Sequence, residues 1–212
     1  PISGLLEQPL VSFEEALASV DLQTKQHHMD AAKYTMFGDG LLTDDEARAV
    51  FMYTCEWTPR QFSLYFLVNL VLRDSDRSKA IPFVPYIKLL CTALGKLLRP
   101  TSGILWRGVA VDLEKVYQAK LGKTIVCWGF TSTTYKMSAL DQFIPENSPC
   151  RTLFSITASL AADLGPYSAY PGEGELLIPA GTVFEVVNVK RFSSSLIIVE
   201  LKAVANLLGL PV

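Results

Sequence analysis

The 212-residue sequence contains only two histidines, the adjacent pair His27 and His28. Any Ser/His/Asp or Cys/His catalytic arrangement would have to use one of them, so nucleophilic catalysis of that kind is disfavoured. The pair lies in a polar segment with no further ligand at metal-binding spacing. We therefore expect both histidines to be plain surface residues.

No Cys-x-x-Cys or Cys/His metal pattern is present, which argues against a zinc site. We expect free and mostly buried thiols, although the even number of cysteines also permits disulfides if the protein is secreted. The four cysteines are Cys55, Cys91, Cys127 and Cys150.

The sequence also lacks long apolar runs and basic runs. The longest strongly apolar stretch, residues 64–72, is too short to span a bilayer, so we expect a buried helix and no membrane span. With a formal net charge of -2 and no run of five or more Lys or Arg, we expect no nucleic-acid partner. The first residues show no secretory signal, but a chain that starts at Pro1 fits a processed or truncated form, so the compartment stays open.

Half of the residues are hydrophobic, enough for a substantial core, and we expect a single domain over residues 1–212. Residues 1–100 read as helical. Thr43 to Glu46 form a capping-box pattern, and Pro59 fits the first turn of a helix that runs to Arg73. Another helix is expected to open at Pro82 or Pro85 and to run to Leu98.

Residues 101–212 read as β-rich, because short runs of β-branched residues alternate with Gly, Pro, Ser and Asn. The sequence thus predicts an α+β fold, with a helical N-terminal part followed by a mixed, mostly antiparallel β core. The expected strands are 104–109, 125–131, 152–158, 173–178, 182–191 and 195–203, with short helices at 112–118 and 138–143.

Arg107 is a candidate anion-binding residue, because it lies in or just after an apolar strand where an unpartnered charge would be costly to bury. A guanidinium can hold phosphate oxygens in a bidentate fashion, and Gly108 permits close approach of a ligand. A salt bridge to an acidic side chain explains Arg107 equally well. The Ser/Thr cluster around Ser132 could likewise serve a ligand or only the end of a strand.

Glu173 and Glu175 form a Glu-x-Glu pair after a loop rich in Gly, Pro and Tyr. In a strand over 173–178 both side chains would project from one face, about 7 Å apart. Paired carboxylates can stabilise an oxocarbenium-like sugar and accept a proton from an attacking group. The alternative is a solvated strand face, and a glycosidase is less attractive because no long sugar-binding cleft rich in Trp and Asp is indicated.

Three motifs, in this order, resemble the Arg–Ser–Glu class of mono-ADP-ribosyltransferases, which includes vertebrate arginine-specific ecto-enzymes and several bacterial toxins. The motifs are Leu-Trp-Arg-Gly at 105–108, Phe-Thr-Ser-Thr-Thr at 130–134, and Tyr-Pro-Gly-Glu-Gly-Glu-Leu-Leu-Ile-Pro-Ala-Gly-Thr-Val-Phe-Glu-Val-Val at 170–187. The resemblance covers residues 100–203 well and the helical part loosely. It implies the ADP-ribosyltransferase fold and NAD as a substrate, with no metal.

The resemblance also implies roles for individual residues. Arg107 would bind the NAD phosphates, and the backbone of Gly108 would hold the nicotinamide carboxamide. Ser132 would brace the catalytic glutamate and the nicotinamide ribose. Glu175 would be that catalytic glutamate, whereas Glu173 would orient the acceptor guanidinium and take its proton. Within the serine motif, Thr133 is expected to bind the cofactor, and Thr134 stands where the family has a serine.

In this family, a glutamate at the position of Glu173 implies arginine as the acceptor. Residues 163–172 would contact the target protein, through Tyr167 or Tyr170. Phe143 would stack on the nicotinamide ring. The implied activity is transfer of ADP-ribose from NAD to a protein arginine, and the alternatives are an NAD glycohydrolase or a catalytically silent module that binds NAD or a protein.

Overall fold

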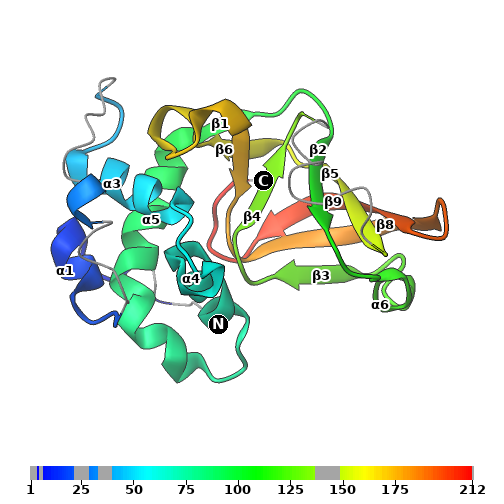
Figure 1. Ribbon diagram of the computed structural model, residues 1–212, viewed down its shortest axis with the longest axis horizontal. Coiled ribbons are helices and arrows are strands. Elements are labelled where there is room, and N and C mark those ends of the chain that lie inside the picture. Colours follow the sequence, from blue (N-terminus) through cyan, green and yellow to red (C-terminus); the bar gives the residue numbers. More distant parts are fainter. Residues whose placement is uncertain (1–3, 5–6, 22–28, 33–39, 137–148, 212) are drawn as a thin grey trace. The chain divides into compact units, whose positions relative to one another are not determined.

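The computed structural model describes residue 4 and residues 7–21, 29–32, 40–136 and 149–211 (Figure 1). The chain folds into two compact units. The first comprises Pro1–Leu98 and Leu164–Gly172, and the second comprises Arg99–Asp163 and Glu173–Val212. The return of the chain to the first unit at Leu164 was not indicated by the sequence pattern.

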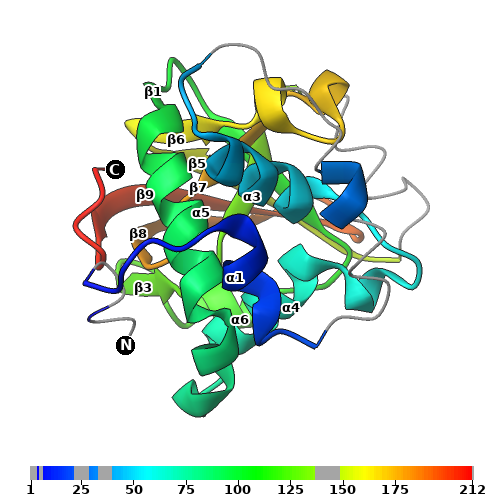
Figure 2. The same ribbon diagram turned by 90° about the vertical axis from the view of Figure 1, so that its left-hand side faces the viewer.

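The first unit is helical, as predicted. Its longest helix, α5, packs against α1 and α3, so that the three helices enclose a shared apolar interior (Figure 2). The α-helices are α1 (Phe13–Ala18), α3 (Asp44–Thr54), α4 (Leu64–Arg73) and α5 (Val84–Leu97), and the 3-10 helices are η1 (Arg60–Phe62), η2 (Arg77–Phe83) and η3 (Gly165–Tyr167).

The capping box predicted at Thr43 is confirmed. The Glu46 backbone N–H donates to Thr43 Oγ1 at 3.3 Å, and the Thr43 N–H donates to Glu46 Oε2 at 2.8 Å. These bonds satisfy donors that the first turn of α3 would otherwise leave unpaired. The Glu46 carboxylate is buried and also pairs with Lys96 Nζ at 2.7 Å, which compensates its charge.

The prediction of one helix from Pro59 to Arg73 is wrong. Only η1 follows Pro59, and α4 begins at Leu64 because Ser63 has an extended backbone with φ -60° and ψ 139°. The Ser63 hydroxyl accepts a hydrogen bond from the Trp57 N–H at 2.9 Å, which holds this break in place. In α5, Pro85 rather than Pro82 lies in the first turn, where its missing N–H costs nothing.

The segment Arg77–Leu97 is long and apolar enough to cross a membrane by length and composition alone. Half of its most apolar window is buried inside the structure, and the core helix of a folded domain passes the same test. Packing of α5 against α1 and α3 accounts for its apolar residues. The absence of a membrane span stays a prediction.

The second unit is built on a nine-stranded sheet with the order β1-β6-β7-β4-β2-β5-β9-β8-β3. Strands β5 and β9 run parallel, whereas β2 pairs antiparallel with β4 and β5, and β8 pairs antiparallel with β3 and β9. This confirms the mixed, mostly antiparallel core. The strands are β1 (Leu98–Pro100), β2 (Leu105–Val109), β3 (Thr124–Cys127), β4 (Thr131–Thr134), β5 (Arg151–Thr157), β6 (Leu160–Asp163), β7 (Glu175–Ile178), β8 (Thr182–Arg191) and β9 (Leu196–Asn206).

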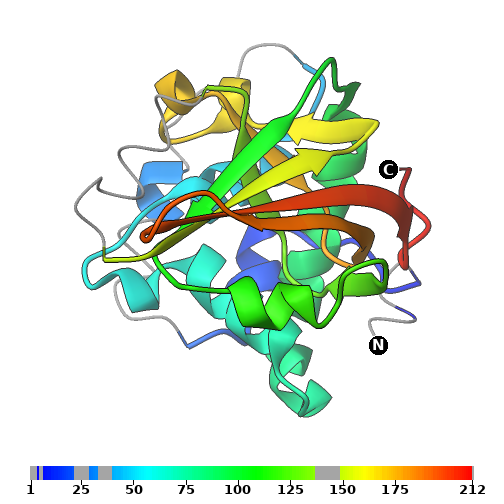
Figure 3. The ribbon, with the colours of Figure 1, turned by 90° about the vertical axis from the view of Figure 1, so that its right-hand side faces the viewer.

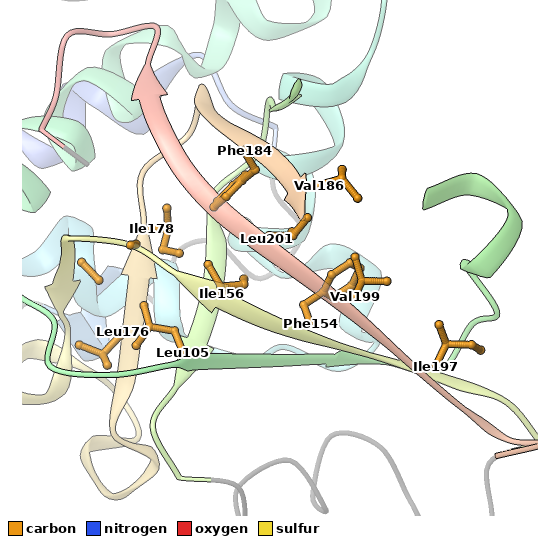
Figure 4. Close-up of a cluster of buried hydrophobic side chains, with 12 residues drawn as sticks. Leu105, Phe154, Ile156, Leu176, Ile178, Phe184, Val186, Ile197, Val199 and Leu201 are labelled. Carbon is orange, nitrogen blue, oxygen red and sulfur yellow. The ribbon is translucent and has the colours of Figure 1, made fainter. Parts of the chain in front are cut away.

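One face of this sheet carries the hydrophobic core of the second unit. Leu105, Phe154, Ile156 and Phe184 are at most 5% exposed and come from three different strands (Figure 4). The hairpin of β8 and β9, orange to red in Figure 3, packs against the short helix α6 (Glu114–Gln118). This helix lies within the range 112–118 predicted as helical.

The predicted strand 125–131 is wrong, because the chain forms two strands there. Strand β3 pairs with β8 at one end of the sheet, whereas β4 pairs with β7 and β2 in its middle. Residues 128–130 carry the chain from one position to the other. Strands β1 and β6 were not predicted, since each has only three or four residues. The helix predicted at 138–143 and the two histidines lie outside the described residues.

All four cysteines are free, as expected. Cys55 and Cys91 are buried, and burial raises the pKa of Cys55 to about 11 and the pKa of Cys91 to about 12. Both therefore stay protonated near neutral pH and are poor nucleophiles. Cys127 and Cys150 are partly buried.

Candidate functional site

The candidate site lies in the second unit, where β4 and β7 pair. Thr134 lies opposite Glu175, and Trp106 of β2 lies opposite Thr134. Residues that face one another across a sheet share a face, as do alternate residues along a strand. The register thus puts Ser132, Thr134 and Glu175 on one face, with Glu175 as the first residue of β7.

Arg107 lies within β2, as the sequence predicted, and it is partly buried. Its guanidinium Nη1 donates a hydrogen bond to the Ser132 backbone oxygen at 3.1 Å. This bond holds the Arg107 side chain against β4.

Glu175 is the site residue with a clearly perturbed acidity. Burial raises the pKa of its carboxyl group above the ordinary 4.5, and the nearby negative charge of Glu173 raises it further. A hydrogen bond from the Ser132 side chain and the positive charge of Arg107 both lower it. The structure therefore brings these four predicted residues into one electrostatically coupled group.

The strand expected over 173–178 begins two residues late, so the predicted same-strand geometry of the two glutamates is wrong. Glu173 ends the 3-10 helix η4 (Pro171–Glu173), and Gly174 has φ +59°. This left-handed conformation is readily adopted only by glycine. The chain therefore turns between the two glutamates instead of running straight.

Thr134 stabilises this turn. Its hydroxyl donates to the Glu173 backbone oxygen at 3.5 Å and accepts a hydrogen bond from the Lys136 N–H at 3.0 Å. The side chain is buried, and its hydroxyl acts on the protein backbone. The replacement of the family's serine by threonine thus retains a hydroxyl with a structural use.

Thr133 and Gly108, also predicted as site residues, are not among the residues coupled to Glu175. Thr133 is 3% exposed, and its hydroxyl donates to the Leu176 backbone oxygen at 2.7 Å. It lies on the face opposite Ser132 and ties β4 to β7, and its role in cofactor binding stays a prediction. Gly108 lies in β2 opposite Leu153, next to Arg107. Phe143 lies outside the described residues.

The two tyrosines suggested for target recognition belong to the first unit. Tyr167 is only 1% exposed and lies in η3, which packs against α3. Tyr170 is 44% exposed. Of the two, Tyr170 is the one with a side chain available to a partner.

Across residue 4 and residues 7–21, 29–32, 40–136 and 149–211, no group of three or more His, Cys, Asp or Glu side chains is arranged to hold a metal ion. The expectation that no metal takes part stays a prediction. The site contains the guanidinium of Arg107 and the carboxylates of Glu173 and Glu175, which suit an anionic ligand beside a centre that develops positive charge.

The fold is that of the ADP-ribosyltransferases. A family model described as NAD:arginine ADP-ribosyltransferase matches residues 8–207. The match spans nearly the whole chain, and the chain belongs to this family.

Among curated proteins, the chain is similar to the GPI-linked NAD(P)(+)--arginine ADP-ribosyltransferase 1 of Oryctolagus cuniculus. The two are 35% identical over 132 residues, which cover 58% of this chain and 38% of the relative. The human protein of the same name is 37% identical over 70 residues, which cover 33% of this chain and 20% of the relative. The chain thus spans well under half the length of these relatives.

Solved structures share the fold. The ADP-ribosyltransferase Vis from Vibrio splendidus, solved in complex with agmatine, aligns with a TM-score of 0.61 and 24% identity, covering 95% of this chain and 90% of Vis. The ADP-ribosyltransferase HopU1 of Pseudomonas syringae aligns with a TM-score of 0.65 and 22% identity, covering 91% of this chain and 95% of HopU1. At these identities the likeness shows the fold alone, and it confirms the predicted fold class.

The sequence did not indicate the presence of Lys136 at the site or the structural role of Thr134. It did not indicate that the Thr134 hydroxyl would hold the Glu173 backbone, nor that Lys136 would lie over Gly174. Lys136 follows the serine motif by only two residues, and this proximity was the one available signal. Both contacts depend on the turn at Gly174, which a strand prediction excludes.

Proposed function

We propose that this chain transfers ADP-ribose from NAD to an arginine side chain of a target protein and releases nicotinamide. The coupling of Glu175 to Ser132, Arg107 and Glu173 in one group is the observation that carries the proposal. Membership of the NAD:arginine ADP-ribosyltransferase family supports it.

Arg107 provides a permanent positive charge for the NAD phosphates, since a guanidinium stays protonated in proteins. Glu175 provides a carboxylate beside the nicotinamide ribose. When the bond between C1′ and the pyridinium nitrogen breaks, its electron pair leaves with nicotinamide, which becomes neutral. The positive charge that remains on the ribose is stabilised by the Glu175 carboxylate, which Ser132 orients.

Glu173 serves the second half of the reaction. An acceptor guanidinium nitrogen attacks C1′, a new C–N bond forms, and the excess proton passes to the Glu173 carboxylate. Free arginine has a pKa near 13.8, so this proton leaves during attack rather than before it. A carboxylate already beside the acceptor is suited to this step. Tyr170, three residues before Glu173 in the chain, is our candidate for contact with the target protein.

One assay of labelled products tests this proposal against two other functions. The protein would be incubated with NAD labelled in the adenosine part, alone or with agmatine, polyarginine or polylysine. We expect label on agmatine and polyarginine, none on polylysine, and a minor amount of free ADP-ribose. Free ADP-ribose as the sole product would indicate an NAD glycohydrolase, and NAD binding without nicotinamide release would indicate a silent module.

Replacing Ser132 with alanine should shift the acid limb of the pH profile of kcat/KM to higher pH. The Ser132 hydrogen bond lowers the pKa of Glu175, so its loss raises that pKa, and the active carboxylate form is then lost at a higher pH. We expect activity at the optimum to fall by about 10- to 100-fold. Nicotinamide release measured from pH 4 to 9 would check this.

The matched control is Ser194→Ala in the turn between β8 and β9, where the side chain is exposed. It should leave the profile unchanged. An acid limb that moves to lower pH in Ser132→Ala would contradict the hydrogen bond to Glu175.

A further inference from the structure

Lys136 covers the glycine that joins the two glutamates. A Cβ atom built on Gly174 would lie 3.4 Å from Lys136 Cε and 3.6 Å from its Nζ. The ammonium end of the lysine therefore lies close to the residue between Glu173 and Glu175.

The backbone around Lys136 is tied to the same turn. The Lys136 N–H donates to Thr134 Oγ1 at 3.0 Å, and the Thr134 hydroxyl contacts the Glu173 backbone oxygen at 3.5 Å. The backbone of Lys136 is thus held in place just after the end of β4. The residue is exposed to solvent. Its position near Gly174 follows from this local geometry within the second unit.

Gly174 has no side chain between its backbone and Lys136. A Cβ at this position would be in ordinary van der Waals contact with Lys136, and the φ of +59° is itself unfavourable for residues other than glycine. The sequence Glu-Gly-Glu therefore combines two carboxylates with room for a cation over the middle residue.

We propose that Lys136 is an acceptor-specificity residue, a resident positive charge at the Glu173-Gly174-Glu175 segment that competes with the incoming guanidinium. The inference rests on the proposed function and adds a determinant to its acceptor step. Because the acceptor is a cation and water is not, Lys136 raises the KM for a small cationic acceptor and leaves NAD hydrolysis unchanged. Two like charges about 6 Å apart that are well exposed to water, at an effective dielectric constant of about 40 to 80, change affinity about 3- to 10-fold.

The charges that act on Glu175 agree with a role for Lys136 that is confined to the acceptor step. The charges that shift the acidity of Glu175 are those of Glu173 and Arg107. In the proposed mechanism, bond cleavage at the nicotinamide ribose depends on Glu175 and these groups, and Lys136 is not among them. The lysine acts where the second substrate enters.

The test compares Lys136→Gln and Lys136→Arg with the unmodified protein, using agmatine as the acceptor. Lys136→Gln should lower the KM for agmatine about 3- to 10-fold, with kcat, the KM for NAD and the rate of NAD hydrolysis within about 2-fold. Lys136→Arg keeps the charge and should keep the original KM. The control Lys202→Gln removes an exposed lysine of β9 and should change none of these values.

An unchanged or higher KM for agmatine in Lys136→Gln would overturn the inference, because the lysine would then be neutral or helpful to the acceptor. A rise in the KM for NAD with no change for agmatine would also overturn it and would assign the charge to the phosphates. Both results leave the proposed function intact. If the unmodified protein transfers no ADP-ribose to agmatine or polyarginine, the proposed function fails and this inference fails with it.

Discussion

Glu175→Gln should abolish nicotinamide release from NAD, with kcat reduced by about 1,000-fold or more, while the Kd for NAD changes by less than about 3-fold. Glutamine has nearly the same shape as glutamate and keeps a hydrogen-bond acceptor for Ser132. It lacks the negative charge that stabilises the ribose when nicotinamide departs. Such a charge acts mainly in the transition state, so its loss lowers kcat and spares ground-state binding.

The measurement is single-turnover nicotinamide release together with calorimetric titration of NAD. Glu185→Gln is the control, because Glu185 is also partly exposed but lies in β8, where it pairs with Thr124 of β3. It should retain full activity. A Glu175→Gln protein with more than a tenth of the original rate would show that another group carries bond cleavage.

Thermal unfolding separates this effect from a loss of structure. Burial raises the pKa of Glu175 in the folded protein, so stability falls as pH rises from the ordinary value of 4.5 through the raised pKa. The neutral glutamine does not carry this penalty. At neutral pH the Tm of Glu175→Gln should therefore equal or exceed that of the unmodified protein.

Local patterns sufficed for the start of α3 and for the order of a helical part followed by a β-rich part. Thr43 and Glu46 satisfy each other's backbone donors, so their spacing alone identifies the start of α3. Arg107 was located within a strand because the apolar residues around it are contiguous. These features depend on neighbours within a few residues, which a sequence displays directly.

Two of the errors arose where pairing partners are distant in the sequence. The break between β3 and β4 exists because β3 pairs with Thr182 and its neighbours, whereas Ser132 in β4 pairs with Leu177. No local signal beyond Gly129 marks it. Likewise the turn at Gly174 is supported by Thr134, 40 residues earlier in the chain. The alternation of Glu173 and Glu175 is equally typical of a strand. Long-range pairing decided both cases.

Glu173→Gln should separate the two halves of the proposed reaction. Transfer to agmatine should fall by about 100-fold or more, because the acceptor guanidinium loses both an ion pair and the group that takes its proton. Hydrolysis of NAD should fall by less than about 5-fold, since Glu175, Ser132 and Arg107 are unchanged and water is a neutral acceptor. Chromatography of labelled products, with and without agmatine, measures both rates in one sample.

The pH profile provides an independent check on the same variant. The charge of Glu173 raises the pKa of Glu175, so its removal lowers that pKa, and the Glu175 carboxylate then persists to lower pH. The acid limb of NAD hydrolysis in Glu173→Gln should therefore move to lower pH, opposite to the shift expected for Ser132→Ala. Equal losses of transfer and hydrolysis would refute the division of roles, because a residue that serves only the acceptor cannot slow both. A left-handed glycine between the two carboxylates makes this division physically reasonable, since it lets one carboxylate act at the ribose while the other faces the acceptor.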